Sequence, residues 1–207
     1  LVDTSGSMQD MAARNVTKRD IAMALGLYVS DRLGRDNPFY RRYLQFASSP
    51  TWCDWRDMTF SVAAGHMTGN CDSTNIQAAL DSVLQCAISL KVPKDQMVTH
   101  LLIISDMQFD ASTYEPSEAV GMYSGCACTG TNKTVVEKAM RLWEEHGYER
   151  PTIVFWNLSG YAGNPARMDT PNTALVSGFS ASILEGVLTG KVVSPLETML
   201  KKLERYQ

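Results

Sequence analysis

The stretch that decides the fold is Leu1-Val2-Asp3-Thr4-Ser5-Gly6-Ser7-Met8. Its first two residues are apolar and end abruptly at a run of small and polar residues, which is typical of a buried β-strand that leads into a loop. A strand usually has about 5–6 residues, so we expect Leu1 and Val2 to be the end of a strand that begins upstream, in a longer protein. Asp3, Ser5 and Ser7 then bring three oxygen-bearing side chains to the carboxyl end of that strand.

Working outward from this stretch, predicted strands and helices alternate along the chain. Apolar residues at helical spacing predict helices over 16–33, 75–90, 135–146, 182–188 and 195–206. Short apolar runs predict strands over 43–47, 58–63, 100–104, 151–156 and 174–176, and Gly-, Ser- and Asn-rich stretches predict loops over 65–73, 110–131 and 159–172. This order predicts one α/β domain over 1–207, with a doubly wound, mostly parallel, Rossmann-like sheet flanked by helices.

Two further segments carry oxygen-bearing side chains to the same edge of that sheet. Ser73, Thr74 and Asn75 stand where a loop enters a helix, and Ser73 or Thr74 is placed to cap it. Ser105 and Asp106 follow the continuous apolar run 100–104, which is typical of a strand buried on both faces. Ligand sites in open parallel sheets form at the carboxyl ends of the strands. We therefore expect these segments to meet the loop after Val2.

These three segments resemble the motifs of von Willebrand factor A-type (vWA) domains. The first stretch matches the family pattern Asp-x-Ser-x-Ser, Thr74 matches its threonine, and Asp106 matches its second aspartate. The amino-acid sequence over 104–110 and 175–180 resembles that of a vWA branch found in plants, protists and large DNA viruses. That branch is similar to the vWA half of the Ro autoantigen, in which a helical-repeat region precedes the vWA domain.

The resemblance implies a metal-ion-dependent adhesion site made of Asp3, Ser5, Ser7, Thr74 and Asp106. All five side chains offer oxygen, the donor that Mg²⁺ prefers, and Mn²⁺ or Ca²⁺ are alternatives. In the family the two serines bind the metal directly, and the aspartates act mainly through water. The implied function is cation-dependent binding of a protein partner that supplies an acidic side chain, without catalysis.

One position departs from the family pattern. Many vWA domains place Gly after the second aspartate, whereas this chain has Met107. A glycine tolerates backbone conformations that methionine resists. We therefore expect a different loop after Asp106, with Met107 on the rim of the site.

Composition limits the other classes of partner. The chain has 19 basic and 22 acidic residues and a net charge of −3, with no basic block that would favour nucleic acid. Any RNA contact is therefore expected of an upstream region. No apolar run approaches the ~20 residues of a membrane-spanning helix. The five cysteines are irregularly spaced, which favours reduced thiols and a cytoplasmic, intracellular protein, with association with a virus particle as an alternative.

Three other interpretations compete with the adhesion site. Asp3, Ser5 and Ser7 could form no more than a polar turn. A Mg²⁺-dependent hydrolase or phosphotransferase would want a second carboxylate where Ser5 stands, and the chain has neither a phosphate-binding Gly-Lys-Ser/Thr loop nor a compelling Ser-His-Asp order. A structural role in a ribonucleoprotein or a virus particle follows from the Ro-like resemblance.

Overall fold

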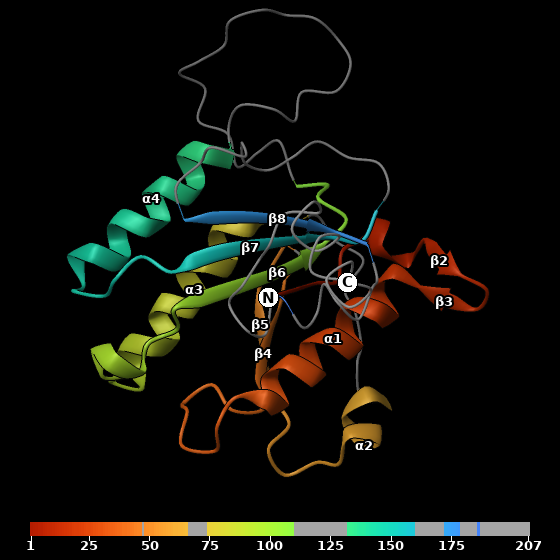
Figure 1. The fold of residues 1–207 in the computed structure, drawn as a ribbon, viewed down its shortest axis with the longest axis horizontal. Coiled ribbons are helices and arrows are strands. Elements are labelled where there is room, and N and C mark those ends of the chain that lie inside the picture. The colour runs from red at the N-terminus through yellow and green to blue at the C-terminus, as the bar shows by residue number, and fades with distance from the viewer. Residues whose placement is uncertain (47, 66–73, 110–131, 160–171, 179–185, 187–207) are drawn as a thin grey trace, which may run out of the picture.

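The fold is a twisted, mostly parallel sheet with helices on both faces, seen in a computed structural model that describes residues 1–46, 48–65, 74–109, 132–159, 172–178 and 186 (Figure 1). Six strands lie in the order β5-β4-β1-β6-β7-β8, and all neighbouring pairs are parallel except β4 with β5. The predicted α/β class with a mostly parallel central sheet is confirmed.

The elements follow one another in the alternation that the sequence predicts. The strands of the sheet are β1 (Val2–Asp3), β4 (Arg42–Phe46), β5 (Thr51–Asp54), β6 (His100–Ser105), β7 (Thr152–Asn157) and β8 (Thr173–Ser177). The helices are η1 (Gly6–Gln9), α1 (Lys18–Arg32), α2 (Phe60–Gly65), α3 (Ile76–Ser89), η2 (Lys94–Gln96) and α4 (Asn132–Glu145). None of these described helices combines the length and the apolar character that a bilayer span requires.

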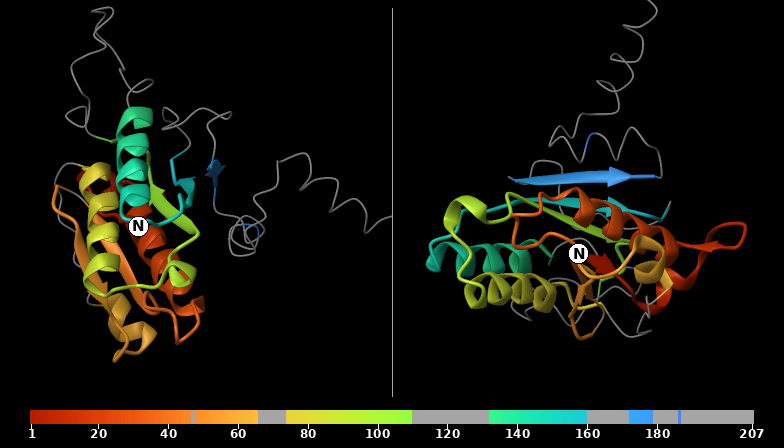
Figure 2. Two further views of the ribbon diagram at one scale, coloured as in Figure 1. Left: turned by 90° about the vertical axis from the view of Figure 1, so that its left-hand side faces the viewer. Right: turned by 90° about the horizontal axis from the view of Figure 1, so that it is seen from below.

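The two faces of the sheet bury separate apolar clusters. α1 covers one face, and α3 and α4 cover the other, as the end-on view shows (Figure 2). Along β6 the side chains alternate between the faces, because Leu101 and Ile103 belong to the cluster under α3 and α4, whereas Ile104 belongs to the cluster under α1. The strand predicted over 100–104 is therefore buried on both faces, as expected for a central strand.

The sequence prediction was wrong in the segment between β4 and α3. The strand predicted over 58–63 is instead the short helix α2, and the edge strand is β5, which pairs antiparallel with β4. The apolar side chains of Phe60 and Val62 are exposed and form no buried strand face, whereas Ala63 packs into the cluster under α1. The helix predicted over 75–90 is confirmed as α3, but its N-cap is Asn75 and not Ser73 or Thr74.

A β-hairpin that the sequence analysis did not predict leads from η1 into α1. It consists of β2 (Met11–Ala13) and β3 (Val16–Thr17), and it projects from the end of the sheet to which the arrowheads of β6 and β7 point (Figure 1). Its strands have three and two residues, too short for a recognisable alternation. The loop 110–131 and the helices 182–188 and 195–206 remain predictions, because they lie outside the described residues apart from Gly186.

Helix α1 lies unusually close to β1 at Gly26. A Cβ atom built on Gly26 would stand 2.5 Å from Cγ2 of Val2, a distance that real Cβ contacts do not reach. Val2 is fully buried and β-branched, so its side chain has little freedom to move aside. The absence of a side chain at Gly26 therefore lets the helix pack against the strand that carries Asp3.

We predict that Gly26→Ala destabilises the protein even though alanine favours helix. The gain in helix propensity is about 1 kcal/mol, whereas overpacking a tight core contact costs about 1–3 kcal/mol. Urea unfolding measures the difference. Gly34→Ala is the control, because a Cβ at Gly34 meets nothing within 4 Å. An increase in unfolding free energy for Gly26→Ala would contradict the close packing.

The turn after β6 has the backbone that a glycine would adopt, although its residue is Met107. The φ angle of Met107 is 64°, in the left-handed region. Its N–H donates to Oγ of Ser105 at 2.9 Å, and its side chain is 4% exposed within the cluster under α3 and α4. The expectation that Met107 lines the rim of the site was wrong, because its side chain is buried in the cluster under α3 and α4.

We predict that Met107→Ala destabilises the protein more than Met107→Gly does. Both variants lose the buried side chain, at a cost of about 2–5 kcal/mol, but only glycine relieves the left-handed strain of about 1–2 kcal/mol. This order reverses the usual preference for alanine over glycine. Paired chemical unfolding of the two variants tests it, and an alanine variant at least as stable as the glycine variant would contradict it.

Candidate metal centre

The candidate centre lies where the neighbouring parallel strands β1 and β6 end. Asp3, the last residue of β1, is fully buried. Its Oδ2 accepts a hydrogen bond of 2.5 Å from the hydroxyl of Ser105, the last residue of β6, and its Oδ1 accepts one of 2.9 Å from the backbone N–H of Ser5. Residues about a hundred positions apart are thus joined at the carboxyl edge of the sheet, as predicted.

The two serines of the first motif lie side by side. The chain turns into η1 directly after Ser5, and the hydroxyl oxygens of Ser5 and Ser7 are 3.3 Å apart. Two neighbouring ligands of an octahedral Mg²⁺ at ~2.1 Å are separated by roughly 3 Å. The two hydroxyls are therefore spaced closely enough to share one cation.

Asp106 is a buried carboxylate whose two oxygens have different surroundings. Its side chain is fully buried, and Oδ1 accepts the N–H of Gln108 at 3.3 Å. Among the residues that the structure describes, none forms a hydrogen bond with Oδ2. Nζ of Lys18 lies 3.6 Å from Oδ2, an ion-pair distance that is too long for a hydrogen bond.

Thr74 is buried at the end of the sheet where these groups lie. It is 2% exposed and directly precedes Asn75, the N-cap of α3. Because α3 runs back across the sheet before β6, its N-terminus faces the carboxyl edge. Among the described residues, no hydrogen bond joins Thr74 to Asp3, Ser5, Ser7 or Asp106. The contacts therefore link Asp3 with both Ser5 and Ser105, and Ser5 with Ser7. Thr74 is assigned to this edge only by its position directly before α3.

Burial dominates the electrostatics of Asp3. Desolvation raises the pKa of its carboxyl to about 6, and the hydrogen bonds from Ser105 and Ser5 only partly oppose this rise. The neighbouring charge of Asp106 raises the pKa of Asp3 further. A positive charge close to the carboxylate of Asp3 would favour its ionised form.

The donor set fits a hard divalent cation. Two carboxylates and three hydroxyls are all oxygen donors, which suits Mg²⁺ and gives no preference to zinc or copper. The part of the chain that the structure describes contains no group of three or more His, Cys, Asp or Glu side chains placed to hold a metal. Any metal here would therefore depend on the hydroxyls of Ser5, Ser7 and Thr74 as well as on the carboxylates.

Ser105 was expected at this edge but was not predicted as a site residue, and Lys18 was not predicted at all. Ser105 directly precedes Asp106 at the end of a buried strand, and that position was the available signal for it. Lys18 reaches Asp106 from the first turn of α1, and a lysine at the start of a helix gave no sequence signal for such a contact. Contact between these segments depends on how α1 packs against β1 and β6.

A cavity of about 140 Å³ lies away from this centre, near the amino ends of the strands. Its lining is mainly apolar and includes Leu1, Leu44 and Leu101. The polar groups of the candidate centre do not line this cavity. The candidate centre and the cavity are therefore separate features of the fold.

Comparisons with known proteins agree with this fold. An uncharacterized protein of Acanthamoeba polyphaga mimivirus is 29% identical over 222 residues, an alignment that covers 100% of this chain and 33% of the viral protein. The crystal structure of the Deinococcus radiodurans Ro (RSR) protein superposes with a TM-score of 0.55 and 16% identity, over 92% of this chain and 34% of that protein. The predicted fold likeness to Ro and the relation to a large DNA virus are confirmed, and this chain spans about a third of either relative.

The comparison with family models covers almost the whole chain. The matching model is described as Domain of unknown function (DUF7788) and extends over residues 1–206. The chain belongs to this family.

Proposed function

We propose that this domain is a protein-binding module that holds a divalent cation in a vWA-type metal-ion-dependent adhesion site. The observation that carries the proposal is the buried Oδ2 of Asp106, which has no hydrogen bond to any residue that the structure describes. Leaving a buried charged oxygen unsatisfied is costly. A cation, or water bound to it, would satisfy that oxygen.

The residues of the centre would have different roles in binding Mg²⁺. Ser5 and Ser7 are the proposed direct ligands, Thr74 is a third hydroxyl ligand, and Asp3 and Asp106 act through water and hydrogen bonds. Mn²⁺ or Ca²⁺ are alternative cations. When bound, the cation supplies an open coordination position to an acidic side chain of the partner protein.

This division of roles favours binding over catalysis. A cation held largely by neutral hydroxyls keeps more of its positive charge than one surrounded by carboxylates, and so attracts an anionic ligand. Ser105 fixes the orientation of Asp3 through a short hydrogen bond, as a supporting residue beside a bound cation would. We therefore propose a non-enzymatic role with a protein as the partner.

The proposal predicts that Asp3→Asn abolishes most of the Mg²⁺ binding. The substitution keeps the shape of the side chain but removes one of two buried negative charges. Isothermal titration calorimetry with Mg²⁺ and with Mn²⁺ should give saturable binding for the wild type and at least tenfold weaker binding for the variant. Asp36→Asn is the control, because Asp36 is an exposed carboxylate in the loop between α1 and β4. Equal affinities for Asp3→Asn and the wild type would refute the assignment.

A second prediction concerns the residue that positions Asp3. Ser105→Ala removes the hydroxyl that donates to Asp3 and accepts from Met107. Loss of such a partner next to a metal site typically weakens metal affinity about 10–100-fold, and leaves a buried acceptor unsatisfied at about 1–3 kcal/mol.

The control for Ser105→Ala is Ser30→Ala. Ser30 is also buried and lies in α1, away from the candidate centre. Its hydroxyl donates to the carbonyl of Leu27 and accepts a hydrogen bond from Nε1 of Trp55. This variant should lose stability without losing metal affinity. If both serine variants bind Mg²⁺ like the wild type, Ser105 has no positioning role.

A further inference from the structure

Lys18 occupies a position that is unfavourable for a lysine. It is the first residue of α1, where the Thr17–Asp20 capping box starts the helix. A positive charge at a helix N-terminus opposes the helix dipole, and the Lys18 side chain is only 11% exposed. Lysine is seldom buried without a partner, so nearby negative charge must compensate for both effects.

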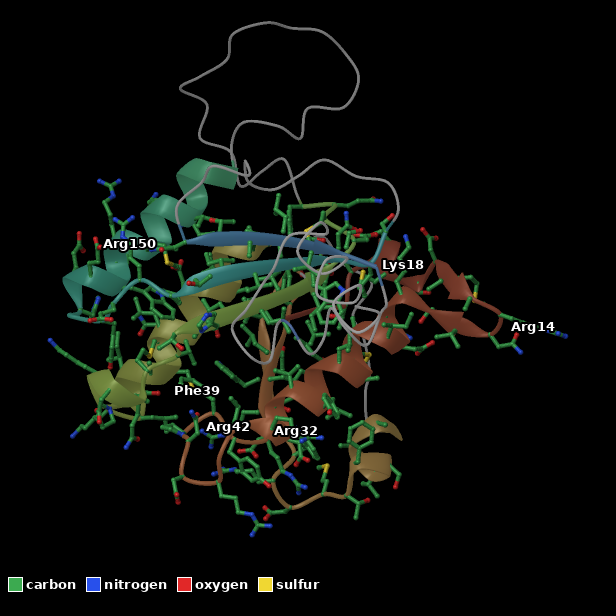
Figure 3. All side chains as sticks on the ribbon, in the orientation of Figure 1. Arg14, Lys18, Arg32, Phe39, Arg42 and Arg150 are labelled. Carbon is green, nitrogen blue, oxygen red and sulfur yellow. The ribbon has the colours of Figure 1, made fainter. Side chains whose placement is uncertain are left out.

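Two carboxylates supply that compensation from opposite sides. Nζ of Lys18 lies 3.1 Å from Oδ2 of Asp10, whose side chain is 70% exposed, and 3.6 Å from Oδ2 of Asp106, whose side chain is fully buried. The backbone N–H of Lys18 also donates to the carbonyl of Asp10 at 3.0 Å. Lys18 thus stands between solvent and the candidate centre, at the carboxyl end of the sheet (Figure 3).

We propose that Lys18 is a built-in monovalent cation that balances Asp106 in the metal-free protein and competes with the divalent cation for it. The competing role rests on the proposed function, whereas the balancing role does not. Asp10 gives the ammonium a second, solvent-exposed partner. Lys18 can therefore keep one ion pair when a divalent cation takes over the charge of Asp106, without leaving its own charge buried and unpaired.

The distances support competition rather than permanent pairing with Asp106. The contact with Asp10 is short enough for a hydrogen bond, but the contact with Asp106 is not. Oδ2 of Asp106 thus remains open to a stronger partner. A divalent cation near this oxygen would also repel the ammonium, because two positive charges a few Å apart in a buried site interact strongly.

The test compares Lys18→Met with the double variant Lys18→Met/Asp106→Asn and with Arg14→Met. Arg14 lies at the exposed tip of the β2–β3 hairpin, so its removal changes the net charge equally without touching Asp106 (Figure 3). Urea unfolding in EDTA measures the balancing role. Lys18→Met should unfold at clearly lower urea than the wild type, and the double variant should recover most of the loss. Arg14→Met should match the wild type.

Calorimetry with Mg²⁺ measures the competing role. We expect Lys18→Met to bind Mg²⁺ about tenfold more tightly than the wild type, because a competing unit charge is gone. Unchanged stability of Lys18→Met in EDTA would overturn the balancing role, and unchanged or weaker Mg²⁺ affinity would overturn the competing role. If neither protein binds a divalent cation, the competing role and the proposed function both fail, and the unfolding data alone decide the balancing role.

If the Lys18→Met variant fails to fold, the double variant still tests the balancing role. If Lys18→Met does not fold in EDTA, folding of the double variant supports the balance of charge between Lys18 and Asp106. Failure of the double variant to fold would show that the aliphatic part of the Lys18 side chain is needed for packing. That result would overturn the proposal.

Discussion

The structure depends on burying two carboxylates at the ends of neighbouring parallel strands. Asp3 ends β1, Asp106 directly follows β6, and both are fully removed from solvent. Each buried ion costs several kcal/mol unless hydrogen bonds or opposite charge compensate, and the two negative charges also repel each other. The local features of this edge, from the hydrogen bond of Ser105 to the position of Lys18, are ways in which the fold meets that constraint.

The negative charges of the two carboxylates are compensated in different ways, so the two side chains differ in how they can respond to a cation. Both oxygens of Asp3 accept hydrogen bonds, one from the strand next to it and one from its own loop, so its orientation is fixed. Asp106 has one oxygen without a hydrogen bond within the described part of the chain, and it forms an ion pair with Lys18, which has a second partner in Asp10. Asp3 therefore serves as the rigid part of the centre, and Asp106 is the part that can respond to a cation.

The sequence predicted the features that depend on local pattern. The apolar run before Ser105 and the polar loop after Val2 sufficed for the central strands, and parallel topology then brought Asp3 to the end of β6. The short hairpin β2–β3 and the edge strand β5 escaped prediction because strands of two to four residues carry little periodic signal. The burial of Met107 in a left-handed turn could not be predicted, because tertiary packing of a buried side chain can outweigh a local backbone preference.

Lys18 could not be predicted, because its role arises only when α1 is docked. The absence of a side chain at Gly26 allows the helix to approach Val2, and the capping box at Thr17 determines where that helix begins. Together they set how far the ammonium of Lys18 stands from Asp106. The start of α1, its packing against β1 and the charge balance at Asp106 therefore depend on one another. A shift of α1 along β1 would move Lys18 relative to Asp106, and so alter the candidate centre, without changing any of the five proposed ligands.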